Sequence, residues 1–195
     1  MESIKRVKSN FIVFCLFLVF FSVFLSGSVS ALTDVTSCGV LSIENETYVL
    51  INDIATGSSS CITIVSDGIT LDGNSHTITA TGFSNGIGVE IYRAHYTIIK
   101  NLGILNFRTG IKLTFDIIDQ VGRGSDNNVI TNNTIRALAV GINFITSKNN
   151  TLTNNNLSAS GFAIQSGMAL FSSNLNTMSG NSVSGFSIGI DCFNS

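Results

Sequence analysis

The hydrophobic positions in the second half of the chain recur with one spacing. An apolar residue is followed by another five positions later and by a third after seven more. Inward-facing residues of one strand lie an even number of positions apart, so the odd step of five requires a turn between the first two. The pattern therefore predicts short strands joined by sharp corners. Four copies follow it: Ile99, Ile104 and Ile111; Ile130, Ile135 and Ile142; Leu152, Leu157 and Ile164; and Met178, Val183 and Ile190.

Polar residues mark the same corners. The segments "NVITNNTI", "NTLTNNNL" and "NTMSGNSV" begin at Asn128, Asn150 and Asn176, so their starts are 22 and 26 residues apart. Asparagine favours turns because its amide bonds to nearby backbone and because it tolerates left-handed dihedral angles. A helix would need steps of three and four over a longer segment, which the frequent Gly, Ser, Thr and Asn disfavour. The repeat therefore predicts an all-β solenoid of stacked coils.

One asparagine recurs at the same position of each copy, as Asn133, Asn155 and Asn181. If coils stack at strand spacing, roughly 4.8 Å, these amides lie above one another and hydrogen-bond along the stack. We therefore expect an asparagine ladder at the corners and apolar residues inside the coils. A disordered Asn/Ser tract is the alternative, but the regular apolar spacing argues against it.

The amino-terminal residues have the pattern of an export signal. "KRVK" precedes an apolar run, Phe11 to Leu25, and "SGSVSA" then places Val29 and Ala31 as in a cleavage site. This is typical of a secretory signal peptide, residues 1–31, cut after Ala31. The run is short for a membrane helix, although an uncleaved anchor is the alternative. We expect a secreted or cell-surface protein that contacts the membrane only if this segment is retained.

The remaining chain reads as one domain. It carries seven Lys or Arg and eleven Asp or Glu, a net charge of −4, so it offers no basic surface for nucleic acid. No proline marks a linker. We assign residues 32–68 to an amino-terminal segment with the first coil and residues 69–195 to the repeats. The last copy stops at Ser195 without a polar cap, so we expect a fragment of a longer protein or a covering partner chain.

The cysteines beyond residue 31 are Cys38, Cys61 and Cys192. In an exported chain we expect Cys38 and Cys61 to form a disulfide that pins the first segment to the first coil, which is worth roughly 3 kcal/mol. Cys192 is then left over. Its spacing from the third apolar residue matches that of Phe144 and Ser166, which predicts a buried thiol.

The segment "CGVLSIENETYVLINDIATGSSSCITIVSDGITLDGNSHTI", followed by the "NTLTNN" repeats, resembles exported archaeal and bacterial β-helix proteins. Their pectin lyase-like repeat is also found in the copper-maturation protein NosD and in carbohydrate-binding or sugar-hydrolase domains. The resemblance implies a right-handed parallel β-helix of about six coils, incomplete at its carboxyl end. It says less about function, because members include lyases, hydrolases, epimerases and adhesins.

Catalytic chemistry has one candidate segment. A glycosidase needs two carboxyl groups about 5 to 9.5 Å apart, but Asp191 is the only carboxylate after residue 127. The loop "TFDIIDQVGRGSDN", residues 114–127, is nine residues longer than its counterpart and would supply the base and cation of a polysaccharide lyase or epimerase. Its oxygens suit Ca²⁺, but their spacing matches no known calcium loop, so we expect no metal or other cofactor. The candidate catalytic residues are Asp116, Asp119, Arg123 and Asp126.

A second polar segment, residues 92–96, suggests a binding site. Together with Glu90 and Lys100, this segment would form a polar and aromatic strip that binds sugars, although isolated histidines also serve structural roles. Its candidate binding residues are Tyr92, Arg93, His95 and Tyr96.

The sequence also contains Asn-x-Ser/Thr sequons, of which the first is the favoured glycosylation site. They begin at Asn45, Asn132, Asn149 and Asn156.

These observations favour a non-catalytic β-helix that recognises an extracellular polysaccharide or a surface protein. The enzymatic alternative is a lyase or epimerase that uses the loop 114–127. A third interpretation is a structural spacer within a larger envelope protein.

Overall fold

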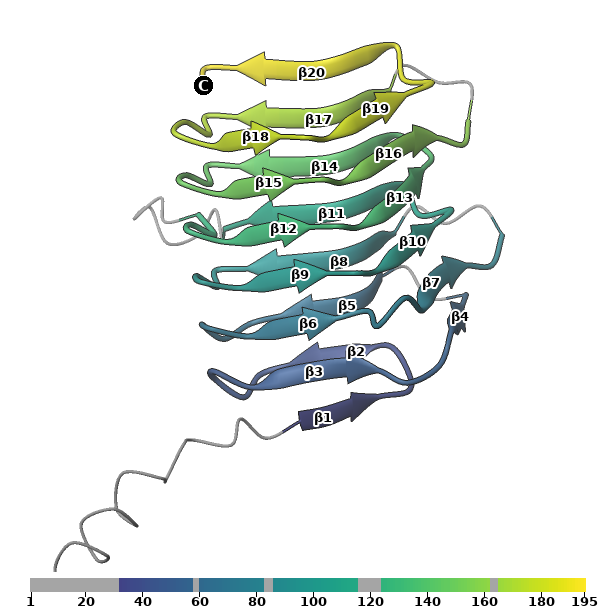
Figure 1. The fold of residues 1–195 in the computed structure, drawn as a ribbon. Helices are drawn as coiled ribbons and strands as arrows, with labels where there is room; N and C mark the ends of the chain where they lie inside the picture. Colours follow the sequence, from purple (N-terminus) through teal and green to yellow (C-terminus); the bar gives the residue numbers. More distant parts are fainter. Residues whose placement is uncertain (1–31, 58–59, 83–85, 116–123, 162–164) are drawn as a thin grey trace, which may run out of the picture. The chain divides into compact units, whose positions relative to one another are not determined.

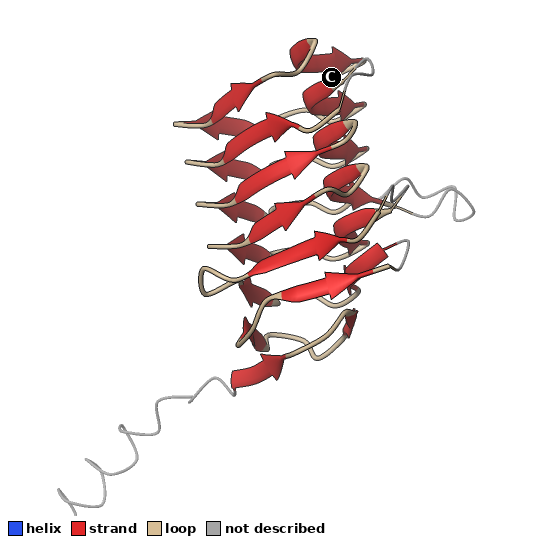
Figure 2. Ribbon diagram, turned by 90° about the vertical axis from the view of Figure 1, so that its right-hand side faces the viewer, coloured by secondary structure: helices blue, strands red, loops and turns tan. Residues whose placement is uncertain are grey.

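A computed structural model describes residues 32–57, 60–82, 86–115, 124–161 and 165–195. The chain divides into two units, Met1–Ser30 and Ala31–Ser195, and the described residues belong to the second. These residues form short β-strands and turns, with no helix among them (Figure 2). The strands stack as a parallel β-solenoid (Figure 1). The predicted all-β solenoid fold is confirmed.

Each complete coil contributes one strand to each of three parallel sheets, because every strand pairs with its counterpart one coil away. Sheet A contains β1 (Leu32–Val35), β3 (Thr47–Leu50), β6 (Thr70–Asp72), β9 (Ile98–Lys100), β12 (Val129–Thr131), β15 (Thr151–Thr153) and β18 (Thr177–Ser179). Sheet B contains β2 (Gly39–Leu41), β5 (Ser60–Ile64), β8 (Ile87–Tyr92), β11 (Thr109–Thr114), β14 (Val140–Ile145), β17 (Ser166–Phe171) and β20 (Ile188–Phe193). Sheet C contains β4 (Ile54–Thr56), β7 (Thr77–Ala80), β10 (Gly103–Leu105), β13 (Thr134–Ala137), β16 (Asn156–Ala159) and β19 (Ser182–Ser184).

The inward residues follow the predicted five-residue step. Ile130 in sheet A and Ile135 in sheet C are both fully buried, and the corner between them lets both point inward. The prediction for the third copy was wrong at its last position. Met168, not Ile164, pairs with Ile142 and with Ile190, because the connection from β16 to β17 is four residues longer than the repeat assumes. Ile164 itself lies outside the described residues.

The predicted asparagine column is hydrogen-bonded along the stack. Asn155 Oδ1 accepts hydrogen bonds from the backbone N–H and from Nδ2 of Asn133, both at 3.0 Å. Asn181 Oδ1 accepts the equivalent bonds from Asn155, at 2.9 and 3.0 Å. The residues before the column members, Asn132 and Asn154, adopt left-handed conformations with φ of 55°. Asparagine therefore serves the corner twice, through its dihedral angles and through its amide.

Two further polar columns follow the same principle. Asn150 Oδ1 accepts from the Asn128 N–H at 2.8 Å, and Asn176 Oδ1 accepts from the Asn150 N–H at 2.9 Å. A serine column lies at another corner, where the backbone N–H of one serine donates to the hydroxyl oxygen of the serine one coil later, at 3.0 to 3.1 Å. Buried polar side chains thus satisfy buried backbone donors. The serine column consists of Ser125, Ser147, Ser173 and Ser195.

A glycine column lies near the start of the sheet B strands, and it allows sheet C to approach closely. A Cβ on Gly141 would meet the carbonyl oxygen of Gly167 and would lie 2.7 Å from Leu157 Cδ2. By contrast, Gly189 in β20 has nothing within 4 Å of that position. Glycine is therefore required where another coil covers the column and is dispensable at the uncovered strand.

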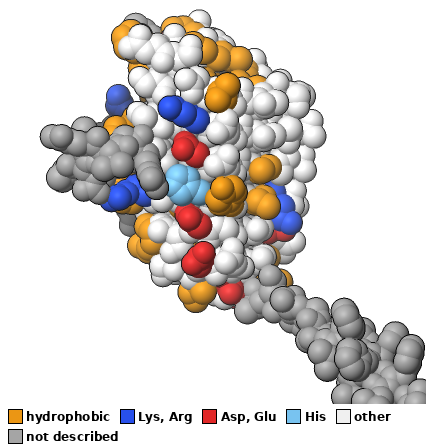
Figure 3. All heavy atoms as spheres, turned by 90° about the vertical axis from the view of Figure 1, so that its left-hand side faces the viewer, with side chains coloured by type: hydrophobic (Ala, Val, Ile, Leu, Met, Phe, Trp, Pro, Cys, Tyr) orange, Lys and Arg blue, Asp and Glu red, His pale blue; other side chains and the backbone are white. Residues whose placement is uncertain are grey.

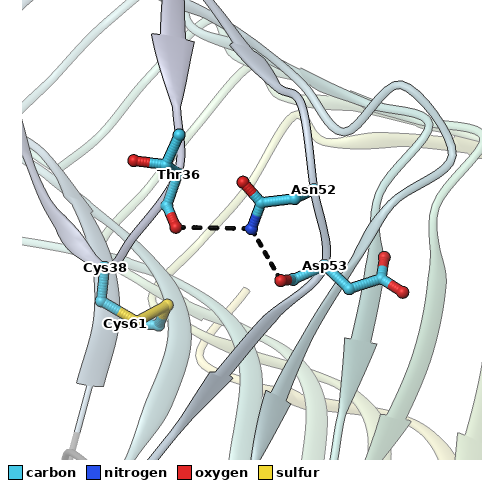
Figure 4. The surroundings of a disulfide bond; sticks show 5 residues. All are labelled: Thr36, Cys38, Asn52, Asp53 and Cys61. Carbon is cyan, nitrogen blue, oxygen red and sulfur yellow. Dashed lines mark hydrogen bonds between the residues drawn. A yellow bond between two sulfur atoms is a disulfide. The ribbon is translucent and has the colours of Figure 1, made fainter.

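The predicted disulfide between Cys38 and Cys61 is present, with a Cα–Cα distance of 4.5 Å. It joins the residue before β2 to β5, so it links two neighbouring strands of sheet B. Beside it, Asn52 Nδ2 donates to the carbonyl oxygens of Thr36 and Asp53 (Figure 4). The first segment is thus tied to the stack by covalent and polar contacts.

The prediction of a buried Cys192 was wrong, since this thiol is free and exposed. Cys192 pairs with Leu170 in the register of sheet B and occupies an inward position. Because β20 is the last strand of the sheet, no described strand covers it.

Candidate binding face on sheet B

An open depression of about 400 Å³ lies on the outward face of sheet B. It spans β8, β11 and β14, where residues of alternating direction point away from the core. Its lining combines apolar, aromatic, hydroxyl and charged side chains, which is the composition of many ligand sites. The lining residues are Glu90, Tyr92, Lys112, Thr114, Phe115 and Ile145.

A partly buried ion pair forms the polar part of the depression. Lys112 Nζ lies 3.1 Å from Glu90 Oε1, and the two side chains are 26 % and 19 % exposed. The residues face each other because β8 and β11 pair with Lys112 opposite Glu90. The pair presents a carboxylate acceptor and an ammonium donor side by side without adding net charge to the depression.

The apolar part lies two residues further along the same strands. Tyr92 is paired with Thr114 across β8 and β11, and the register places Ile145 next in line on β14. Phe115 follows β11 and completes the lining. Together with the ion pair, these residues form an aromatic and apolar surface next to hydrogen-bonding groups.

A buried, unsatisfied oxygen lies beside the ion pair. Asn143 is paired with Lys112 in the register of β11 and β14. Its Oδ1 is buried and has no hydrogen-bond partner among the described residues. Since buried polar atoms are nearly always satisfied, this oxygen stands out as a hydrogen-bond acceptor without a partner at this face.

The predicted binding strip is divided between surfaces. Tyr92 and Glu90 line the depression on sheet B, whereas Lys100 lies on sheet A and forms an ion pair of 3.1 Å with Asp72. His95 and Tyr96 occupy the corner between the two sheets. The strip is therefore not one site, and its binding role stays a prediction for the corner residues.

Polar residues at that corner form a row along the stack, which we call the corner row and define as Asp67, His95, Asp126 and Lys148. Asp67 Oδ1 accepts the His95 N–H at 2.8 Å, and His95 Nδ1 accepts the Asp126 N–H at 3.1 Å. Asp126 Oδ1 accepts the Lys148 N–H at 2.6 Å. Figure 3 shows this face, with acidic side chains (red) on either side of a histidine (pale blue). These contacts give the row a structural role in joining coils.

Asp126 is the one candidate catalytic residue that the structure describes. Its carboxylate is engaged by the Lys148 backbone, so a structural contact accounts for it, and its catalytic role stays a prediction. Asp116, Asp119 and Arg123 lie outside the described residues.

Two residues of the predicted strip have unusual backbone geometry. Tyr96 has φ of 56° and is 65 % exposed, and Arg93 has φ of 55°. The left-handed region costs bulky residues roughly 1–2 kcal/mol. The equivalent corner of another coil holds Leu175, with φ of 59° and 74 % exposure. The strain at Tyr96 therefore belongs to the corner geometry and does not by itself indicate a site.

One pKa shift concerns the sheet A ion pair. Burial alone would raise the pKa of Asp72, but hydrogen bonds from the Asn74 N–H and the Asn101 amide act in the opposite direction. Together with the nearby Lys100 ammonium, they lower the pKa of Asp72 below its ordinary value of 3.8. Asp72 therefore stays ionised at neutral pH and holds the corner through charge-assisted hydrogen bonds.

The four sequons occupy different environments. Asn45, Asn132 and Asn149 are exposed at left-handed corners, and Asn156 is exposed at the start of β16. Glycosylation at any of them stays a prediction.

The chain matches no protein-family model, no curated protein and no solved structure. Within the described part of the chain, no group of three or more His, Cys, Asp or Glu residues is placed to hold a metal ion. The described residues also include no helix long and apolar enough to cross a membrane.

Sequence reasoning singled out Glu90 and Tyr92 but missed Lys112 and Ile145. A signal for Lys112 is present, because it follows the inward residue Ile111 as Glu90 follows Val89, one repeat of 22 residues earlier. Comparing outward positions between repeats, and not only inward ones, would have found the pair.

Proposed function

We propose that this protein is an exported or cell-surface β-helix protein that binds an extracellular polysaccharide through the depression on sheet B, without catalysing a reaction on it. The observation that carries the proposal is the position of the Tyr92 ring beside the Glu90–Lys112 ion pair in one open depression. An aromatic ring packs against the apolar face of a sugar, while the carboxylate accepts and the ammonium donates hydrogen bonds to its hydroxyls.

The same lining argues against catalysis. Glu90 is the only carboxylate among the described residues of the depression, and a glycosidase needs two. A lyase or epimerase needs a free base, but Glu90 is held by Lys112 at 3.1 Å.

Export is supported by the disulfide between Cys38 and Cys61 and by the signal-like residues 1–31. We also propose that this chain is related to proteins with NosD-type and sugar-hydrolase repeats.

Affinity electrophoresis in gels containing neutral and acidic polysaccharides tests the function. The unaltered protein is expected to be retarded by at least one polysaccharide. Tyr92→Ala and Lys112→Met are expected to weaken binding by about tenfold or more, because each removes one half of the site. Lys148→Met is the matched control, since it makes the same charge change at an exposed residue of the corner row.

The opposing outcomes are distinct. Retardation by no polysaccharide would reject the function and favour the structural spacer. The release of unsaturated or epimerised sugars, abolished by Asp116→Ala or Arg123→Ala, would instead establish the enzyme that uses the loop 114–127.

A further inference from the structure

The outward face of sheet B carries an apolar row beyond the depression, which we define as Ile145, Phe171 and Phe193. Ile145 is paired with Phe171 across β14 and β17, and Phe171 with Phe193 across β17 and β20. The two phenylalanine rings have centroids 6.2 Å apart at an interplanar angle of 51°. Since Ile145 also lines the depression, the row and the depression form one continuous surface.

The phenylalanines of this row are not explained by the core. Phe171 is 40 % exposed and Phe193 60 % exposed, whereas their neighbour Leu170 is buried inside the coil. Strand alternation places the phenylalanines outside because Leu170 faces inward. Adjacent exposed aromatic residues on a flat sheet indicate a contact surface more than a packing requirement.

The charges beside the row restrict the ligand. The parallel outward row contains Glu90, Lys112, Asn143, Ala169 and Asp191, paired in this order across sheet B. Glu90 and Lys112 neutralise each other, while Asp191 adds a negative charge. A polyanionic glycan would be repelled at Asp191. Hydroxyl groups suit the row better, because Glu90 and Lys112 offer an acceptor and a donor and Asn143 carries an acceptor without a partner among the described residues.

We propose that the ligand is an uncharged polysaccharide chain that crosses the strands of sheet B, from Tyr92 in the depression to Phe171 and Phe193. The inference rests on the proposed function and deepens it by naming the ligand class and a second binding region. Four strand spacings separate Tyr92 from Phe193, about 19 Å at roughly 4.8 Å each. A disaccharide fills the depression without reaching Phe193, whereas a longer chain contacts both regions.

The experiment measures affinity against chain length by titration calorimetry. The probes are length-fractionated oligosaccharides of glucan, mannan and xylan, with polygalacturonate fragments as the charged comparison. For the full chain, affinity for the neutral probe that binds is expected to rise about tenfold from the disaccharide to the longest fraction. Phe171→Ala is expected to remove this gain and to leave disaccharide affinity unchanged. Leu175→Ala is the matched control, because Leu175 is 74 % exposed but lies outside sheet B.

Each other outcome overturns the proposal. An affinity that does not depend on length, or a length gain that survives Phe171→Ala, rejects the second binding region and leaves the function in the depression intact. Tighter binding of polygalacturonate fragments rejects the uncharged ligand. Self-association that Phe171→Ala abolishes, with no change in glycan affinity, assigns the row to a protein contact. Binding of no saccharide at any length rejects the proposed function as well.

Discussion

The substitution Gly141→Ala tests the close packing between sheets B and C. The new methyl group would meet the carbonyl oxygen of Gly167 and would lie 2.7 Å from Leu157 Cδ2. Leu157 is fully buried, and the Gly167 oxygen belongs to the backbone of the next strand, so neither neighbour moves aside easily. Relief requires a shift of β14 against β17, which weakens the ladder between them.

The expected destabilisation is about 2–3 kcal/mol. Overpacking a dense core costs about 1–3 kcal/mol, and backbone contact places this site at the upper end. The lower conformational entropy of the unfolded alanine chain offsets about 0.4–1 kcal/mol. With a urea m-value of about 2 kcal/mol/M, the midpoint of unfolding is expected to fall by about 1 M.

The control is Gly189→Ala, in the same glycine column but with nothing within 4 Å of the added carbon. It is expected to leave the midpoint unchanged or to raise it slightly, since only the entropic effect remains. Urea unfolding followed by circular dichroism compares the two variants. Equal midpoints would show that the column is not sterically required and would refute the reasoning.

Three other predictions concern stability. Asn155→Ala is expected to lower the unfolding free energy by about 2–4 kcal/mol, because two donors of the neighbouring coil lose their acceptor. The control, Asn156→Ala, changes an exposed residue and should have little effect. Equal losses of stability in urea unfolding would argue against the ladder. Tyr96→Asn and Leu175→Asn are each expected to stabilise the fold by about 1 kcal/mol, because asparagine tolerates the left-handed backbone conformation of the corner. A loss of glycan binding in the Tyr96 variant alone would show that the binding site lies at the corner. Because the pKa of Asp72 is lowered in the folded state, its stabilisation is present above the ordinary value of 3.8 and is lost as the pH falls through the lowered value. Asp72→Asn should therefore flatten the acid side of a plot of melting temperature against pH, and an unchanged acid limb would contradict this.

The sequence by itself determined the coil. The odd step from Ile130 to Ile135 required a corner. The recurrence of Asn133, Asn155 and Asn181 indicated which side chains would accept hydrogen bonds from the backbone N–H groups at that corner. These features were readable because they depend on chemistry within one repeat: strand alternation, turn preference and the hydrogen-bonding capacity of the amide.

Connections of variable length limited the prediction. The longer connection before β17 replaced Ile164 by Met168 as the inward residue, because strand pairing sets the register and sequence spacing does not. The exposure of Cys192 likewise depends on whether another strand covers its position. An alignment of the repeats does not carry this information.

The candidate site was decided by the tertiary structure. Tyr92 and Glu90 stood out in the sequence, but they were grouped with Lys100 and His95, which are near in sequence and lie on other surfaces. Stacking instead places Glu90 beside Lys112. In a parallel solenoid a side chain on a strand meets its surface neighbours one coil away, so a binding face runs across the strands and is spread over the sequence.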